Sequence, residues 1–261
     1  MSSVKKRKKK HKCTPHKRGS LLAGATLPLL VLLLSLGTAV VYIESGRDGS
    51  PSRPQNDAIA ENSEDIAPAD YLAMLLVNEV PFPGEPSFKS MEDSKAAMRA
   101  IVWVIERRRG EIPKGYTRRQ VAATASTSIV DIMTAFNQME GFYRTPSGSH
   151  TTVPRVTERL AYLQLLAARG TMPVIAELLD YANTTAQAYI QKRTLPHPEP
   201  FTRLRRIDGI EVTGSAYGWM TDEVQYHPGG NFVRIPDNDG GSLGGNRFFT
   251  LRRTPLRKET Q

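Results

Sequence analysis

Cysteine is almost absent from this chain of 261 residues. The one cysteine, Cys13, lies near the N-terminus, so no disulfide can form within the rest of the chain and its stability must come from an apolar core. Only three histidines, His150, His197 and His227, follow the first 20 residues, and none has the helical spacing of a zinc site. No nucleophile elbow or phosphate-binding loop occurs either. We therefore predict no metal site and no cofactor.

Acidic residues are missing from residues 1–20, which form a strongly basic tail. This tail holds nine of the 35 lysines and arginines, so the remaining 26 match the 26 aspartates and glutamates. The net charge of +9 therefore belongs to the tail, and the rest of the chain is neutral. A neutral body offers no basic surface for nucleic acid, so we predict no nucleic-acid partner.

Charged residues are also absent from Leu21–Ile43, which would span about 34 Å as a helix, against about 30 Å for a bilayer core. The apolar run predicts a transmembrane helix, and the basic tail before it predicts a cytoplasmic N-terminus. This pattern indicates a single-pass protein of the inner (cytoplasmic) membrane with a periplasmic or extracytoplasmic C-terminal domain. A cleaved signal peptide is the alternative, because Gly37-Thr38-Ala39 has small residues at cleavage-like spacing.

Large apolar residues are scarce in residues 44–63, where Pro, Gly, Ser and Asp are scattered. Such a segment cannot bury enough apolar surface to fold, so we predict a flexible linker. The folded domain is then expected over residues 64–261.

Two apolar segments joined by a turn organise this domain. In the first, Leu72, Leu75 and Leu76 recur at helical spacing before Pro81 ends the helix. The second follows Ser90, a suitable N-cap, and continues to an arginine-rich end. Similar patterns predict four more helices, over residues 118–125, 129–137, 154–169 and 173–193. Thr117 with Gln120 and Ser128 with Asp131 have capping-box spacing at the start of the first two.

Residues 201–261 have a different composition, with frequent Gly, Pro and Asp. Short β-prone pieces at 209–212, 231–235 and 248–251 predict a loop-rich region with a small sheet or hairpin. Residues 141–152 are polar and glycine-containing, which predicts a loop.

Glu79 occupies an unusual position for a carboxylate. It lies in the last turn of the first predicted helix, one turn after Leu75 and Leu76, where desolvation and the helix dipole both disfavour the anion. A glutamate with a raised pKa suits a general acid. The alternative is that Glu79 points outward into solvent while the leucines point inward.

Carboxylates and aromatic residues suited to sugar binding also occur elsewhere, because aromatic faces pack on sugar rings and carboxylates catalyse glycosidic cleavage. Most aromatic residues are otherwise expected in the core. The candidates for a groove are Glu79, Glu85, Glu140, Phe142, Tyr143, Tyr217, Trp219, Tyr226, Phe248 and Phe249.

Several segments resemble cell-wall hydrolases of the spore-cortex-lytic type. Asn78-Glu79 precedes Gly84-Glu85-Pro86, as a glutamate precedes Gly-Glu-Pro in that family, and Val104–Arg107 is similar to its helix end Val-Ile-x-Asn-Arg. Residues 136–144 and Gly244–Phe249 are similar to its later motifs. The chain departs from the family where Glu106 replaces Asn and Arg247 replaces His.

The resemblance implies a lysozyme-like fold. Together with the patterns above, the expected fold is a mainly α, lysozyme-like helical domain with a loop-rich C-terminal part containing a small β element, preceded by one transmembrane helix. It also implies that Glu79 is the catalytic acid acting on peptidoglycan glycan strands. The substrate-binding candidates that accompany it are Glu85, Gln138, Glu140, Phe142, Tyr143 and Phe248.

One evident carboxylate favours lytic transglycosylase chemistry, in which the same residue acts as acid and base and a substrate hydroxyl attacks. If Glu85 or Glu140 lies across the groove, hydrolysis by a muramidase-type reaction becomes possible. The alternative function is a non-catalytic peptidoglycan-binding or envelope scaffold protein. The sequence does not indicate any protein partner for this chain.

Overall fold

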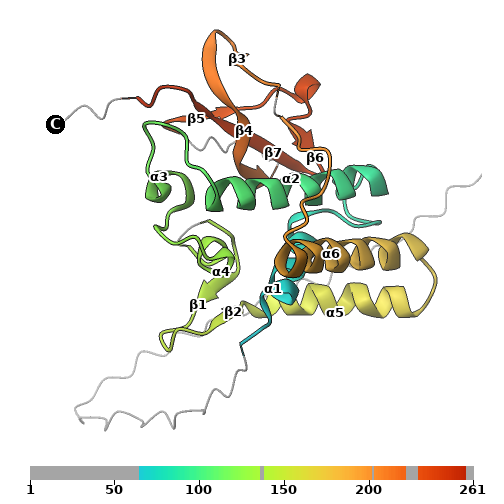
Figure 1. Cartoon of the computed structure of the whole chain (residues 1–261). Coiled ribbons are helices and arrows are strands. Elements are labelled where there is room, and N and C mark those ends of the chain that lie inside the picture. Colours follow the sequence, from blue (N-terminus) through green and yellow to red (C-terminus); the bar gives the residue numbers. More distant parts are fainter. Residues whose placement is uncertain (1–64, 136–137, 202, 222–228, 257–261) are drawn as a thin grey trace, which may run out of the picture. The chain divides into compact units, whose positions relative to one another are not determined.

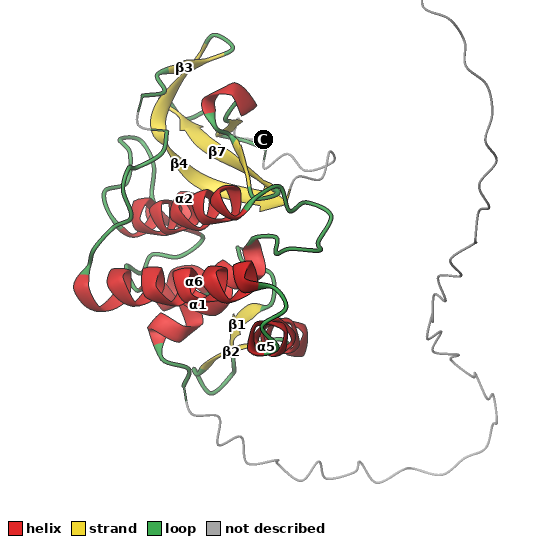
Figure 2. Cartoon of the chain, turned by 90° about the vertical axis from the view of Figure 1, so that its right-hand side faces the viewer, coloured by secondary structure: helices red, strands yellow, loops and turns green. Residues whose placement is uncertain are grey.

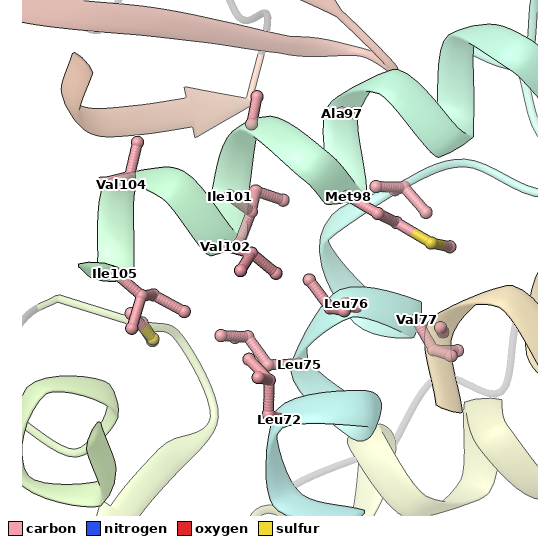
Figure 3. Packing of buried hydrophobic residues seen from close by; sticks show 14 of the residues in the cluster. Leu72, Leu75, Leu76, Val77, Ala97, Met98, Ile101, Val102, Val104 and Ile105 are labelled. Atoms are coloured by element: carbon pink, nitrogen blue, oxygen red, sulfur yellow. The ribbon is translucent and has the colours of Figure 1, made fainter. Parts of the chain in front are cut away.

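Two helices, α1 (Pro68–Glu79) and α2 (Met91–Arg109), carry much of the hydrophobic core of the computed structural model. The structure describes residues 65–256 except 136, 137, 202 and 222–228. Pro68 begins α1, and the Ser90 hydroxyl caps α2 by accepting from the Asp93 backbone N–H at 3.1 Å, as predicted. Apolar side chains of both helices meet in the core (Figure 3), including Leu72, Leu75, Leu76, Met98, Ile101 and Ile105.

The remaining helices surround this pair. The short helices α3 (Arg118–Ala122) and α4 (Ile129–Met133) follow α2, and a hairpin of β1 (Phe142–Arg144) and β2 (His150–Thr152) connects them to α5 (Pro154–Ala168) and α6 (Pro173–Lys192). Helix α6 packs against both α1 and α2, and α5 packs against α1 and α6. Figure 2 shows these helices on one side of α2 and the C-terminal sheet on the other.

A five-stranded antiparallel sheet forms the C-terminal part. Its order is β3-β4-β7-β5, with β6 pairing β7 next to the short 3₁₀ helix η1 (Asp237–Asp239). The long strand β4 faces α2, which therefore lies between the sheet and the other helices (Figure 1). The strands are β3 (Arg206–Ile207), β4 (Ile210–Thr221), β5 (Phe232–Arg234), β6 (Ser242–Leu243) and β7 (Asn246–Arg252).

The predicted fold class is wrong for this part of the chain. Over the described residues the domain has six α-helices and a five-stranded sheet, rather than a mainly helical fold whose loop-rich end contains only a small β element. The reason is that β4 and β7 pair along nearly their whole length, with irregularities in register near Ala216. Glycine and small polar residues hide a strand from a pattern search, although backbone pairing still accommodates them at such irregularities. Residues 142–152, predicted as a loop, include the β1–β2 hairpin.

The predicted basic tail (1–20), apolar run (21–43) and linker (44–63) lie outside the described residues. Among the helices of residues 65–256, none is both long enough and apolar enough to cross a bilayer. Each long helix there has a polar face: even α6, with 20 residues, exposes polar side chains such as Glu177 and Asp180. This finding contradicts three predictions. They are the transmembrane helix in the fold class, the membrane as a partner, and the single-pass inner-membrane localisation.

Candidate functional site

Glu79 is the last residue of α1, and the chain leaves the helix directly after it. Val80 has an extended backbone, and Pro81 cannot continue the helix because it lacks a backbone N–H. The preceding turn, Leu75–Val77, is buried in the core. A packed helix therefore holds the Glu79 carboxyl group in place, as a site that depends on fixed geometry requires.

Strands β4 and β7 reach the end of α1 and hold Glu79 from the sheet side. The indole N–H of Trp219 donates to Glu79 Oε2 at 2.7 Å, and the Asn246 side-chain amide donates to the Glu79 backbone carbonyl at 2.5 Å. Glu79 Oε1 has no hydrogen-bond partner among the residues that the structure describes. One carboxyl oxygen is fixed by the indole, and the other is left to exchange a proton.

A cavity of about 1200 Å³ opens at Glu79. Its walls come from the end of α1, the segment between α4 and β1, strand β1, the first turns of α5 and the end of β4. Pockets for small ligands usually measure about 300–1,000 Å³, so this cavity can take an extended ligand. Polar side chains line it together with three aromatic residues, Phe142, Tyr143 and Trp219.

Burial raises the pKa of Glu79 above its ordinary value of 4.5. The hydrogen bond from Trp219 opposes this rise, because it favours the carboxylate. The negative charge of Glu140 adds to the rise, while the guanidinium groups of Arg155 and Arg159 reduce it. Glu79 therefore keeps its proton to a higher pH than an exposed glutamate, and the same surroundings still accept the anion.

Four of the predicted substrate-binding residues line the cavity with Glu79: Gln138, Glu140, Phe142 and Tyr143. Phe142 is buried and meets the Tyr71 ring edge to face at 5.2 Å, so it forms part of the cavity wall. Tyr143 keeps 43% of its surface exposed, and its ring is available to a ligand. Glu140 lies at the rim, where Arg155 contacts it at 2.6 Å.

The other two predicted residues lie elsewhere. Glu85 accepts from Arg159 at 2.8 Å and from the Phe82 backbone N–H at 2.8 Å, and Arg159 also donates to the Val80 carbonyl at 3.0 Å. This arrangement ties the segment after α1 to α5, so Glu85 supports the cavity wall from behind. Phe248 is fully buried beside Phe201, in the core.

Of the remaining aromatic candidates, one lines the cavity and two are buried in the core. Trp219 lines the cavity, whereas Tyr217 and Phe249 are buried, Tyr217 in a second apolar cluster with Val121 and Leu251. Tyr226 lies outside the described residues.

Glu106 occupies the position where the resembling family has Asn, and its hydrogen bonds connect two helices. Its carboxylate accepts from Arg109 at 2.8 Å and from the Tyr189 hydroxyl at 2.6 Å, which joins α2 to α6. Although partial burial raises its pKa, these hydrogen bonds together lower the pKa below the ordinary value.

Comparison with family models, curated proteins and solved structures gives no match for this chain. The geometry of the cavity therefore carries the functional argument, together with the motif resemblance.

Several residues of the site were not singled out from the sequence. Arg155 and Arg159 lie at i and i+4 on α5 and both reach the cavity, a spacing that places them on one helix face. Asn78 lines the cavity and Asn246 holds the Glu79 carbonyl, although both belong to segments that carried the resemblance. The contact of Trp219 with Glu79 joins residues 140 positions apart, which no local pattern can indicate.

Within the part of the chain that the structure describes, no group of three or more His, Cys, Asp or Glu residues is placed to hold a metal ion.

Proposed function

We propose that this chain cleaves peptidoglycan glycan strands, with Glu79 as the general acid and base. The observation that carries the proposal is the Glu79 carboxyl group itself. It is desolvated at the wall of a large cavity, fixed through one oxygen by the Trp219 indole, and has a raised pKa. The motifs around Glu79 that resemble cell-wall hydrolases supply the substrate class.

In the first step, protonated Glu79 gives its proton to the glycosidic oxygen as the bond between that oxygen and the anomeric carbon breaks. The leaving sugar departs as an alcohol, and positive charge develops on the remaining sugar. Glu79 then carries a negative charge, which the hydrogen bond from Trp219 stabilises. The same hydrogen bond holds the carboxylate in position for the second step.

In the second step, the Glu79 carboxylate acts as a base. It accepts the proton of a hydroxyl group of the same sugar as that oxygen bonds to the anomeric carbon, which gives an anhydro sugar and restores protonated Glu79. Among the described residues that line the cavity, the one other carboxylate is Glu140. Because Glu140 is 85% exposed and paired with Arg155, this single-carboxylate route is favoured over hydrolysis.

The cavity rim suits a polar, extended ligand. Tyr143 presents an exposed ring, and the Gln138 side chain supplies an amide that can donate to and accept from sugar hydroxyls. Arg144 and Arg155 add cationic groups at the rim. These groups support binding of glycan strands, which a non-catalytic peptidoglycan-binding protein would also need.

Incubation of the purified chain with peptidoglycan, followed by mass analysis of the released fragments, tests the proposal. We expect anhydro fragments, which are lighter by one water than the products of hydrolysis. Hydrolytic fragments would instead implicate Glu140 as the residue that activates water. Binding to peptidoglycan without any released fragment would refute cleavage and favour the scaffold alternative.

A further inference from the structure

Arg108 is a buried cation in the last turn of α2, with 5% of its surface exposed. Burial lowers its pKa to about 10, so the guanidinium stays charged at neutral pH. No carboxylate within the described part of the chain forms an ion pair with it. Its Nη1 atom is buried and makes no hydrogen bond to any described residue.

The guanidinium instead faces the indole of Trp219. The Arg108 Cζ atom lies 5.5 Å from the centre of the Trp219 ring, a cation–π geometry. Arg108 Nε donates to the Tyr217 backbone carbonyl at 2.8 Å, which fixes the guanidinium against β4 two residues before Trp219. The edge of the same indole donates to Glu79. Arg108, Trp219 and Glu79 therefore form a continuous contact chain from α2 to the cavity.

An unpaired buried charge is costly to the fold, because desolvation removes its interactions with water. A link between α2 and β4 needs only a donor for the Tyr217 carbonyl, and a neutral side chain can provide one. The positive charge has a consequence that a neutral side chain lacks. A cation over the indole face draws electron density from the ring and makes its N–H a stronger hydrogen-bond donor.

We propose that Arg108 is a positioning residue whose charge holds the Trp219 indole and strengthens the hydrogen bond that Trp219 gives to the Glu79 carboxylate. The cation thereby favours the charged form of Glu79 without touching the cavity. It would act in the second step of the proposed reaction, when Glu79 must return as a base. The inference rests on the proposed function of Glu79.

Other charged groups also act on Glu79. Glu140 beside β1 disfavours its anion, while Arg155 and Arg159 on α5 favour it. Arg108 differs from the two α5 arginines in two respects: it has no carboxylate partner among the described residues, and it reaches Glu79 through Trp219. A charge change at Arg108 can therefore be tested without altering the residues that line the cavity.

The indole N–H of Trp219 provides a direct readout. The chain has two tryptophans, and the other, Trp103, donates to the Pro196 carbonyl, away from Glu79. In the full chain labelled with ¹⁵N-tryptophan, Trp103→Phe assigns the two indole signals. The Trp219 signal should then titrate with Glu79 ionisation, and Glu79→Gln should abolish that titration.

Arg108→Gln keeps a donor for the Tyr217 carbonyl but removes the charge, and Arg108→Met also removes the charge while keeping bulk. We expect either variant to raise the midpoint of the Trp219 titration by about 0.5–1 pH unit, since an opposite charge no longer favours the carboxylate. Arg108→Lys keeps a cation and should stay within about 0.3 unit of the wild-type midpoint.

A folded neutral variant with the wild-type midpoint would overturn the proposal, as would a lysine variant that shifts as far as the glutamine variant. If neither neutral variant folds, the lysine variant is the remaining test: a midpoint within about 0.3 unit of wild type is the expected result, and any larger rise overturns the proposal because the positive charge is kept. The readout needs no substrate. A shifted midpoint in a chain that releases no glycan fragment refutes the proposed cleavage alone, whereas an unshifted midpoint in an active chain refutes the role of Arg108 alone.

Discussion

Replacement of Glu79 by glutamine separates the contribution of this residue to catalysis from its cost to the fold. Glutamine keeps the size of the side chain, and its amide oxygen can still accept the indole hydrogen bond that Trp219 now gives to Oε2. It carries no transferable proton and no charge. The variant therefore removes the acid–base function while leaving the local packing in place.

The expected stability effect follows from the raised pKa of Glu79. Below pH 4.5, the ordinary value, the residue is protonated in both the folded and the unfolded chain, so it adds no pH dependence. Above that pH the unfolded chain releases the proton first, and the folded chain loses stability until its own, higher pKa is passed. Each unit of elevation costs about 1.4 kcal/mol at high pH. Glu79→Gln should therefore be more stable than wild type at neutral and alkaline pH, with the advantage vanishing near pH 4.

The activity effect has the opposite sign. General acid–base catalysis is typically worth about 10²–10⁴-fold, so fragment release by Glu79→Gln should fall by about that factor. Wild-type activity should also fall as pH rises above the folded pKa of Glu79, because the acid form disappears. Initial rates of fragment release across pH, together with urea unfolding over the same range, measure both effects on the same preparations.

Glu92→Gln provides a matched control, because it makes the same chemical change at a side chain that is 73% exposed near the start of α2, where it pairs with Lys95 at 3.7 Å. It should leave the activity unchanged and lower the free energy of unfolding by at most about 1 kcal/mol, since exposed ion pairs contribute little. Wild-type fragment release by Glu79→Gln would end the catalytic assignment. An unfolding difference that does not vary with pH would show that Glu79 has an ordinary pKa, and the argument from desolvation would fail.

Four further substitutions test the structure around the site. Trp219→Phe removes the N–H that stabilises the Glu79 carboxylate, so we expect the alkaline fall in activity to move up by about one pH unit, measured from the pH–rate profile. Arg159→Met leaves a partly buried carboxylate and backbone carbonyls without their donor, which should lower the free energy of unfolding by about 2–3 kcal/mol in urea; an unchanged value would contradict the clamp. Gly244→Ala and Gly84→Ala both strain a left-handed backbone, but only the first creates a clash, at 2.6 Å, so calorimetry should show a loss larger by about 1–3 kcal/mol for Gly244→Ala. Equal losses would mean that the junction between β6 and β7 relaxes freely.

Local signals in the sequence located helices well where capping and periodicity agree. The capping box predicted at Thr117 and Gln120 forms, and the Ser128 hydroxyl accepts from the Asp131 backbone as predicted. The ends of these short helices were predicted too late, because Ala123 takes a left-handed conformation that stops α3. Capping chemistry is local to one turn, which is why it can be recognised without the fold.

The extent of the sheet could not be inferred in the same way. The β-prone pieces predicted at 209–212, 231–235 and 248–251 coincide with the start of β4, with β5 and with the middle of β7, but Gly214 and Gly218 interrupt the pattern further along β4. Its stability comes from pairing with β7, which is about 30 residues further along the chain, and from packing on α2. Such contacts are properties of the assembled fold rather than of any segment.

The candidate site also combines features that local sequence signals indicate with contacts that only the fold creates. The position of Glu79 followed from the helix pattern, and its desolvation followed from the leucines before it. The donor that controls its charge, Trp219, lies on β4 beyond the β-prone piece predicted at 209–212, and the arginine that faces its indole ring lies at the end of a different helix. Sequence patterns can thus indicate which carboxylate is unusual, while the groups that set its properties emerge only from tertiary packing.

The placement of charge around Trp219 gives the strongest physical reason to regard this region as functional. A fold selected for stability alone would expose Glu79 and Arg108 or pair them with opposite charges, since each loses free energy by desolvation. Instead, Arg108 is buried over the face of the Trp219 indole, Glu79 is partly buried at the indole N–H, and neither forms an ion pair with a described residue. Their attraction through the ring recovers only part of that cost. A loss of stability around one carboxyl group is characteristic of sites that must change their protonation state during a reaction. The same reasoning explains why replacement of Glu79 is expected to stabilise the chain and inactivate it together.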